Sequence, residues 1–587
     1  MAKFFKYLLA TFVGGLVAAL FLFVILLGFI GGIVALSSEE VVVKDNSILL
    51  LRLNGPIVER LTPNPIQDLF DEMSDKPQTE GLNQILSNID KAKRDPKIKG
   101  ILLDGGMLSA GYATIEEIRN ALGSFKESGK FVYAYGTIYT QKAYYLASVA
   151  DKVYVTPSGM VQFSGIYSER MFFKGTLEKL GVEMQVFKVG KFKSAVEPFI
   201  EEKMSDPARE QTQVYINSIW AHVLDKVSES RNIDKNSLNQ LANQMPMFLD
   251  PQLLVDNGLV DGLKYKDELL VELKDLTNTS QSDDLASVTN KQYVNVFVEK
   301  ERKGLERDKI AVIYASGDID GTSSDGIKSD DLSRTIREAR RDSSVKAIVL
   351  RINSPGGSAL GSEIIWREVK LAKETKPVVV SMGDLAASGG YYIACAADTI
   401  VAHPTTLTGS IGIFGIIPNA QGLFNKIGIT FDGAKTNQFS DMPDLARPFR
   451  PEEKALMQAY VERGYQLFTQ RCADGRKTTR NYIDSIGQGR VWAGQKSVDI
   501  KLVDKLGGIN DAIAVAKDMA KLDNYKLVEL PAEEDPLKQF LKGAGGGAKA
   551  WAIKTLIGDG AEYLNAIEEL PNNCPIQARL PYQIHLN

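Results

Sequence analysis

The sequence predicts an α/β protein built from two copies of one unit, placed behind a single apolar N-terminal segment. Three observations favour this fold class. Short apolar, β-branched runs that are typical of buried strands alternate with helix-like stretches. The pattern of residues 95–103 returns at 342–350, and that of residues 144–157 returns at 391–404 with a constant spacing of 247 residues. A repeated unit of alternating strands and helices indicates a tandem duplication.

The N-terminal segment is predicted to be a transmembrane anchor over residues 8–37. After Lys6 no charged residue occurs until Glu39, and this apolar run exceeds the roughly 20 residues that a transmembrane helix needs. A cleavable signal peptide has an apolar stretch of only about 7–15 residues, although residues 35–37 could pass for a cleavage site. The charges flanking the span favour a cytoplasmic N-terminus, residues 1–7. In a Gram-negative cell the remainder would then lie in the periplasm.

Composition excludes several function classes. The 587 residues suggest two or more domains, and 69 basic and 73 acidic residues are well mixed, which does not indicate a nucleic-acid partner. Cys395, Cys472 and Cys574 are too few and too scattered for a disulfide framework or a zinc site, although a Cys472–Cys574 bridge stays open. Neither a P-loop nor an HExxH motif occurs, so we expect no cofactor and no metal.

Domain limits follow from the duplication and from breaks in composition. We expect a first half with a helical linker over residues 38–305 and a second half over 306–542. A glycine-rich break at 543–547 begins a C-terminal tail, residues 543–587. The sequence leaves open whether this tail is mobile or docks on the rim.

Two glycine-containing turns in the second half suggest a catalytic site. A strand-like run at 377–380 is followed by small residues, then by Ser388 and the start of a helix. A serine at such a junction exposes its hydroxyl beside free N–H groups that favour an oxyanion, although a turn packed with small residues is the alternative. Another strand-like run, 347–353, ends at Gly356 and Gly357, where the backbone can approach a ligand closely.

These turns carry a resemblance to a known family. The NSPGG turn at 353–357, ASGGYY at 387–392 and LTGSIG at 407–412 together resemble the signal peptide peptidase A (protease IV) family of membrane-anchored serine peptidases. The similarity thins after about residue 542. The resemblance implies a Clp protease/crotonase-like fold for each half, with an oxyanion hole formed by Gly389 and by Gly356 or Gly357. It also implies cleaved signal peptides as substrates and a homotetramer in the inner membrane.

A serine nucleophile needs a base, and histidine is scarce. Of His222, His403 and His585, only His403 lies near the motif, and no carboxylate is evidently placed to complete a triad. A serine–lysine dyad is a known alternative. Burial in an apolar setting lowers the pKa of a lysine and so allows it to accept a proton. The apolar segment 186–199 of the first half offers such lysines: Lys188, Lys191 and Lys193.

The choice of lysine rests on the resemblance. Strand alternation places Lys191 and Lys193 on one face, and each could equally be a solvated surface charge. The family's base lies in a KSAVEPF-like segment, which implies Lys193 as the general base and leaves Lys191 as second choice. The family's lysine-orienting serine corresponds to Ser410, which could otherwise be a turn serine.

The two halves have complementary losses. At the spacing of 247 residues, Ser388 aligns with Gln141 and Ser410 aligns with Phe163, so the first half lacks the nucleophile. We therefore expect a serine endopeptidase with a Ser388–Lys193 dyad, acting on remnant signal peptides and other unfolded peptides. A catalytically inactive membrane scaffold and a crotonase-type acyl-CoA enzyme stay open as alternatives. The sequence also leaves open whether the dyad forms within one chain or between chains.

Overall fold

The computed structural model describes residues 41–61, 79–106, 108–298, 307–321, 323, 326–532 and 576–579, together with 3–4, 6–7, 10–15, 17–18 and 21. Most of the anchor predicted over residues 8–37 lies outside the described residues. Within the described part, no helix combines the length and the apolar character that crossing a membrane requires.

The first unit is built on a parallel six-stranded sheet in the order β8-β6-β5-β4-β1-β9. The four longer strands are rich in buried apolar residues, as the sequence predicts. The six strands are β1 (Ser47–Arg52), β4 (Ile98–Asp104), β5 (Phe131–Tyr139), β6 (Lys152–Val161), β8 (Gly262–Leu263) and β9 (Ser287–Thr289). A separate parallel pair joins β2 (Ile57–Val58) and β3 (Glu80–Gly81).

The second unit repeats this arrangement and extends it to eight strands. The order β19-β10-β11-β13-β14-β18 matches that of the first sheet, and β15 and β17 continue from β13. Its strands are β10 (Lys309–Ser316), β11 (Val345–Ser354), β13 (Val378–Ala387), β14 (Thr399–Ala402), β15 (Leu407–Gly409), β17 (Val491–Ala493), β18 (Lys505–Leu506) and β19 (Lys526–Leu530). The central strand β13 is buried along most of its length, as expected for a parallel strand covered on both faces.

Detailed matches between the units support the duplication. Strands β11, β13 and β14 each begin 247 residues after β4, β5 and β6. The fully buried hydroxyls of Tyr144 and Tyr391, also 247 residues apart, each donate to a leucine carbonyl, that of Leu259 and that of Leu502. The predicted α/β class with two related units is therefore confirmed.

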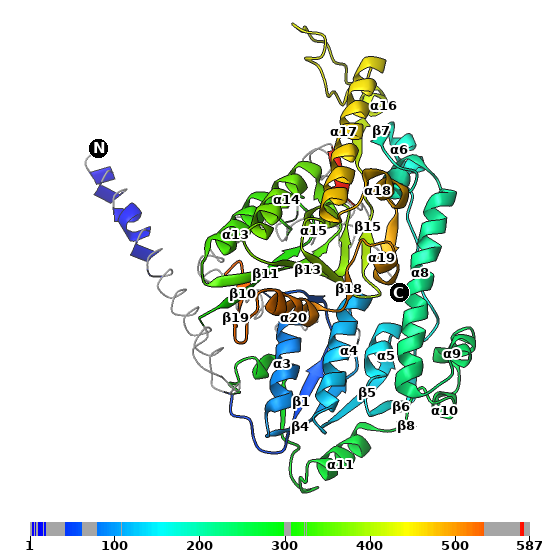
Figure 1. Cartoon of the computed structure of the whole chain (residues 1–587), viewed down its shortest axis with the longest axis vertical. Coiled ribbons are helices and arrows are strands. Elements are labelled where there is room, and N and C mark those ends of the chain that lie inside the picture. Colours follow the sequence, from blue (N-terminus) through cyan, green and yellow to red (C-terminus); the bar gives the residue numbers. More distant parts are fainter. Residues whose placement is uncertain are drawn as a thin grey trace.

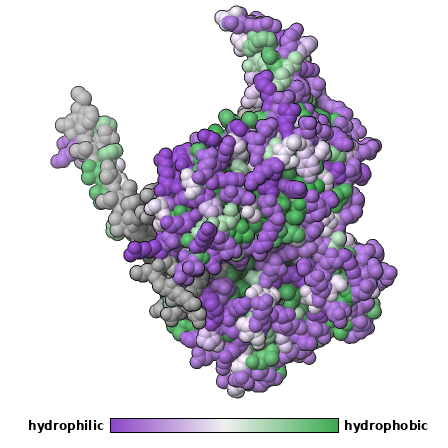
Figure 2. Space-filling view, in the orientation of Figure 1, coloured by the Kyte–Doolittle hydropathy of each residue, from purple (hydrophilic) through white to green (hydrophobic). Residues whose placement is uncertain are grey.

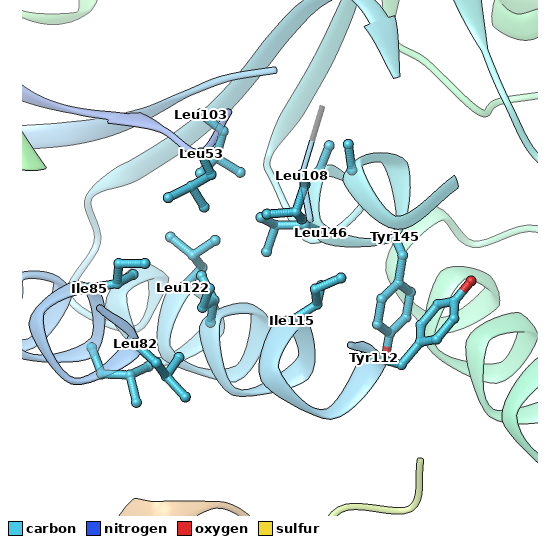
Figure 3. Close-up of a cluster of buried hydrophobic side chains, with 14 of the residues drawn as sticks. Leu53, Leu82, Ile85, Leu103, Leu108, Tyr112, Ile115, Leu122, Tyr145 and Leu146 are labelled. Carbon is cyan, nitrogen blue, oxygen red and sulfur yellow. The ribbon is translucent and has the colours of Figure 1, made fainter. Parts of the chain in front are cut away.

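A layer of helices separates the two sheets (Figure 1). It contains α3 (Leu82–Arg94), α4 (Tyr112–Lys126) and α20 (Ile509–Met519), whose apolar side chains share one core with both sheets. In α3 these side chains recur every three or four residues, which gives the helix one apolar face. Figure 3 shows part of this core, where Leu82 and Ile85 of α3 and Ile115 and Leu122 of α4 gather below the first sheet.

The remaining helices cover the outer faces and the ends of the sheets. In the first unit they are α5 (Gln141–Ala147), α6 (Lys174–Leu180), α7 (Glu197–Ile200), α8 (Asp206–Arg231), α9 (Lys235–Ala242), α10 (Pro251–Asp256), α11 (Lys266–Leu276) and α12 (Asn290–Tyr293). In the second they are α13 (Ser329–Arg341), α14 (Ala359–Lys373), α15 (Gly389–Ala394), α16 (Gln421–Lys426), α17 (Pro451–Gly475), α18 (Arg480–Ile486) and α19 (Gly494–Asp499). The chain around α16 projects from the body (Figure 1), and polar side chains cover most of the face seen in Figure 2.

A small third sheet joins the two units. Its order is β12-β20-β16-β7, from β12 (Gly356–Ser358), β20 (Ile576–Arg579), β16 (Phe414–Asn419) and β7 (Glu183–Lys188). Strand β7 belongs to the first half, and it pairs antiparallel with β16 of the second half over six residues. The tail strand β20 pairs antiparallel with both β12 and β16. The C-terminal tail therefore docks, through this strand, in the sheet that connects the halves.

Candidate active site

Ser388 sits at a sharp junction between a strand and a helix. Strand β13 ends at Ala387 and α15 begins at Gly389, and between them Ser388 takes a φ of 55° and a ψ of −114°. Such a backbone conformation costs a non-glycine residue on the order of 1–3 kcal/mol, and it is found most often at functional sites. The junction aims the serine side chain away from the strand and leaves the first N–H groups of α15 without helical partners.

The glycines after Ser388 are required by close packing. A Cβ at Gly389 would lie 2.6 Å from Ser362 Oγ, and one at Gly390 would lie 2.8 Å from the Ser354 carbonyl oxygen. Only glycine fits at either position without displacing its neighbours. The small residues of this segment thus serve packing and also shape the junction.

Lys193 reaches the same place from the first half. Strand β7 ends at Lys188, and the chain then turns so that Phe192 N–H donates to the Gln488 carbonyl at 3.0 Å. A Cβ at Gly489, whose φ is 80°, would lie 2.6 Å from the Lys193 Cβ. The segment around Gly489 therefore packs directly against the backbone of Lys193.

The Lys193 ammonium group contacts both serines that the sequence singled out. Lys193 Nζ lies 2.8 Å from Ser388 Oγ, 3.1 Å from Ser410 Oγ and 3.2 Å from the Ser410 carbonyl oxygen. Lys193 is 1% exposed, and both serines are completely buried. These contacts form within one chain.

Burial changes the acid–base chemistry of Lys193. It lowers the pKa of the Lys193 amine from its ordinary value of 10.5 to about 7 because the charged form is removed from water. An amine with that pKa is neutral in about half of the molecules at pH 7, so it can accept a proton from a hydroxyl.

The structure separates Lys193 from the second-choice lysine. Alternation along a strand does not apply, since the strand ends at Lys188 and the residues after it form a turn. Lys191 is exposed, with its ammonium 4.8 Å from the centre of the Phe192 ring. Only Lys193 of the three lysines contacts Ser388 among the hydrogen bonds of the described residues.

Ser410 is held in place by its backbone. It has a φ of 49°, and its N–H donates to the Arg490 carbonyl at 2.7 Å. Together with Gly409, whose carbonyl accepts from Ser388 N–H at 2.8 Å, it fixes the end of β15 beside the nucleophile junction. The hydroxyl of Ser410 is thereby positioned against Lys193 Nζ.

Gly356 and Gly357 lie beside Gly389. A Cβ at Gly356 would come within 2.5 Å of the Gly389 nitrogen, so the turn and the start of α15 are in close contact. Gly356 N–H already donates to Ser354 Oγ at 3.1 Å, so it is not free to donate to an oxyanion. Of the two glycines, Gly357 is therefore the better candidate for the second donor of an oxyanion hole.

Two supporting residues were not predicted from the sequence. Gln211 of α8 donates to the Phe192 carbonyl at 2.9 Å and accepts from Val491 N–H at 3.0 Å, so it ties the lysine segment to β17. Ser354 orients the Gly356 peptide. Gln211 has no local sequence pattern, because it acts on residues far away in the chain. Ser354 lies in the NSPGG turn itself, and its contact with Gly356 is local.

His403 and His222 contact glutamates of α4 rather than the serine site. His403 is buried with its ring nitrogens 3.7 Å from Glu116 Oε2 and 3.5 Å from Glu117 Oε1, both on α4 of the first unit. Burial lowers the pKa of His403, but the two carboxylates outweigh this effect and raise the pKa to about 9. A histidine that is protonated at neutral pH cannot serve as a base. His222 lies 2.8 Å from Glu116.

The corresponding place in the first unit is filled by an amide. Gln141 Oε1 accepts from the N–H groups of Ser164 and Gly165, both at 2.9 Å, and its Nε2 donates to the Tyr112 hydroxyl at 2.8 Å. A carboxamide with these bonds is neither nucleophile nor base. The first unit thus contributes the lysine and the second unit contributes the serine.

Buried serine, neutral lysine and nearby backbone donors define the chemistry of a serine hydrolase. Comparison with known proteins agrees: the model of "Peptidase family S49" matches the chain twice, over residues 124–280 and 370–523. The chain belongs to peptidase family S49, and it is a serine peptidase.

Relatives and one solved structure are similar to the chain over different shares of its length. Protease 4 of Salmonella typhi is 38% identical over 86% of this chain and 83% of its own length. The chloroplastic serine protease SPPA of Arabidopsis thaliana is 34% identical over 92% of this chain and 78% of its own length. A ClpP1 mutant from Listeria monocytogenes aligns with a TM-score of 0.24 and 14% identity, over 34% of this chain and 94% of that chain.

Proposed function

We propose that the chain is a serine endopeptidase whose dyad consists of Ser388 as nucleophile and Lys193 as general base. The observation that carries this proposal is the 2.8 Å contact between Lys193 Nζ and Ser388 Oγ in a buried setting. Since burial makes the amine neutral near pH 7, the pair can transfer a proton without a histidine or a metal ion.

The reaction then proceeds in two stages. Lys193 takes the hydroxyl proton of Ser388 while the oxygen attacks the peptide carbonyl carbon. The N–H groups of Gly389 and Gly357 donate to the oxyanion, and Lys193 passes its proton to the leaving amine. Water, deprotonated by Lys193, hydrolyses the acyl-enzyme. Ser410 orients the lysine throughout. Losing one oxyanion donor typically costs about 100–1,000-fold in rate.

The substrates proposed are signal peptides that remain after their release, together with other unfolded peptides. Similarity to proteins named Protease 4 supports a peptide substrate. We further propose a single-pass anchor over residues 8–37 in the bacterial inner membrane, with residues 1–7 cytoplasmic and the rest periplasmic. A homotetramer and a Clp protease/crotonase-like description of the halves, 38–305 and 306–542, belong to the same proposal.

The test is hydrolysis of an unfolded, internally quenched fluorescent peptide by the full chain in detergent. We expect Ser388→Ala and Lys193→Ala to lose activity while their circular dichroism stays that of wild type. Lys191→Ala is the matched control, because Lys191 is two residues away and exposed, and it should keep activity within about twofold. Full activity in Lys193→Ala would remove the dyad from the proposal, and an inert wild type would favour the scaffold alternative.

A further inference from the structure

The two strands that lead to the catalytic turns shift against each other just before those turns. The regular pairing of β11 with β13 is interrupted between Ile352 and Ser354. One residue of β11, Asn353, therefore faces three residues of β13, 383–385, which form a bulge. Bulges are frequent next to active sites, where they change the direction of a nearby side chain. This bulge ends three residues before Ser388.

The bulge determines which residues meet at the site. Ser354 pairs with Ala386, whereas the pairing that precedes the bulge, continued without a break, would place Ser354 opposite Asp384. The shift amounts to two residues, which span about 7 Å of strand. It brings the start of α15, at Gly389, against Gly356 of the glycine turn. Because a misplacement of about 1 Å can cost about 100-fold in rate, this register matters for the reaction.

Asn353 connects the bulge to the first unit. Its Oδ1 accepts from Leu385 N–H at 3.2 Å, which gives that donor the partner that the interrupted ladder does not supply. Its Nδ2 donates to Glu59 Oε1 at 2.8 Å. Glu59 is buried and also accepts from Arg351 Nε at 2.7 Å, so its carboxylate is fixed. A Cβ at Gly383 would lie 2.4 Å from Glu59 Oε1, which places that carboxylate directly against the bulge.

Asp384, at the centre of the bulge, also contacts the first unit. Its carboxylate accepts from Thr114 N–H at 3.0 Å and from the Thr114 hydroxyl at 2.5 Å. Thr114 lies in the first turn of α4, where N–H groups lack helical partners and an anion is favoured. A contact within the second unit completes the arrangement, since Thr406 Oγ1 donates to the Gly383 carbonyl at 2.8 Å. The bulge is therefore held from both units.

The first unit lacks both side chains at the corresponding positions. At the spacing of 247 residues, Asn353 corresponds to Gly106 and Asp384 corresponds to Thr137. Glycine has no side chain to bridge a bulge, and threonine has no charge for a helix N-terminus. The two contacts are thus confined to the unit that holds the nucleophile, which relates them to the reaction rather than to the fold that both units share.

We propose that Asn353 and Asp384 are positioning residues, which hold the bulge of β13 and thereby set Ser388 against the backbone donor of Gly357. This inference rests on the proposed peptidase function and adds two residues to it. Both side chains act through the backbone of β13, and both are held by groups of the first unit. The first unit therefore aligns the nucleophile in addition to supplying the lysine.

The experiment measures kcat and KM of full-chain variants in detergent with an internally quenched peptide. We expect Asn353→Ala and Asp384→Ala each to lower kcat about 10–100-fold and to leave KM within about twofold, because the nucleophile is misplaced. The rise of kcat/KM with pH should stay near 7, since neither change touches Lys193. Asn83→Ala is the matched control: its amide also crosses between the units, to Glu529 of β19 at 3.1 Å, and kcat should stay within about twofold.

Two further measurements test the route of the effect. Thr114→Val removes only the hydroxyl donor and should lower kcat about threefold, but in a chain that already carries Asp384→Ala it should change kcat by less than about 1.5-fold. Hydrogen exchange of the Leu385 amide, which needs no activity, should be at least about tenfold faster in Asn353→Ala than in wild type. The same amide should exchange at the wild-type rate in Asn83→Ala.

The outcomes are distinct. If wild type hydrolyses peptide and both Asn353→Ala and Asp384→Ala keep its kcat, the peptidase stands and the positioning role is refuted. If kcat falls as far in Asn83→Ala, the contacts only stabilise the fold and the inference is again refuted. An equal loss from Thr114→Val with and without Asp384 would exclude action through the first unit. If wild type is inert while the Leu385 amide still responds to Asn353→Ala, the proposed activity is what fails.

Discussion

The lowered pKa of Lys193 predicts the pH dependence of the reaction. A lysine with its ordinary pKa of 10.5 would be neutral in roughly one molecule in 3,000 at pH 7, whereas a pKa of about 7 makes about half of the molecules competent. Because the base must be neutral, kcat/KM should rise with pH through about 7 and then level off. One pH unit below that value should cost about tenfold, and two units about a hundredfold.

The assay is kcat/KM for an internally quenched peptide between pH 5 and pH 9 at constant ionic strength, with tryptophan fluorescence recorded at each pH as a control for unfolding. A profile that is flat between pH 6 and pH 8, or one that still rises tenfold per pH unit up to pH 9, would refute the assignment of Lys193 as a buried neutral base. A bell-shaped profile with its acid limb near pH 7 is compatible with it, provided that Lys191→Ala leaves that limb unchanged.

Stability offers a second measure of the same pKa, independent of catalysis. The unfolded chain binds one more proton than the folded chain between about pH 7 and pH 10, so wild-type stability should rise with pH in that window. At pH 7 the lowered pKa of Lys193 destabilises the folded chain by about 4 kcal/mol. Lys193→Met removes this destabilisation, but it also removes the hydrogen bonds to Ser388 and Ser410, which offsets part of the gain. Its melting temperature relative to wild type should therefore be higher at pH 7 than at pH 10. An unchanged difference between these pH values would contradict the reasoning.

Three further changes have directions set by the structure. Ser410→Ala removes the 3.1 Å contact with Lys193 Nζ and should lower kcat about 10–100-fold at constant melting temperature, and an unchanged kcat would rule out the orienting role. Gly489→Ala adds a Cβ 2.6 Å from that of Lys193 at a φ of 80° and should lose more than tenfold in kcat/KM, while Gly433→Ala, with open space around it, should lose nothing. Because the pKa of His403 is raised to about 9, its stabilising contribution is complete below about pH 6.5 and lost as pH rises through 9. His403→Gln should lower the melting temperature more at pH 6 than at pH 10; equal losses would exclude that ion pairing.

The sequence predicts the repeated unit well because strands and turns carry local patterns. Apolar runs of four to eight residues followed by glycine-containing turns mark β11 and β13, and the spacing of 247 residues is readable without any contact. Ser388 is recognisable for the same reason, since the small residues that its junction needs are its own neighbours in the chain.

The parts that sequence reasoning leaves open depend on distant contacts. Lys191 and Lys193 can be told apart only when the turn after Lys188 and the packing of Gly489 against Lys193 are known. The carboxylates facing His403 come from α4, far earlier in the chain, so no local search finds them. Residues 576–579 have no periodic pattern, and their strand exists because β12 and β16 offer partners on both sides.

The buried charge between the two units has a consequence for how the chain can be divided. Arg351 of β11 is completely buried and pairs with Glu59 at 2.7 Å and with Glu117 at 2.6 Å, both from the first unit. Breaking a buried pair by removing one partner typically costs about 3–5 kcal/mol. A second unit expressed alone would retain the cation without either anion. The two duplicated units therefore depend on each other, because the cation lies in one and its two anions lie in the other. We expect both units to unfold together in a single step.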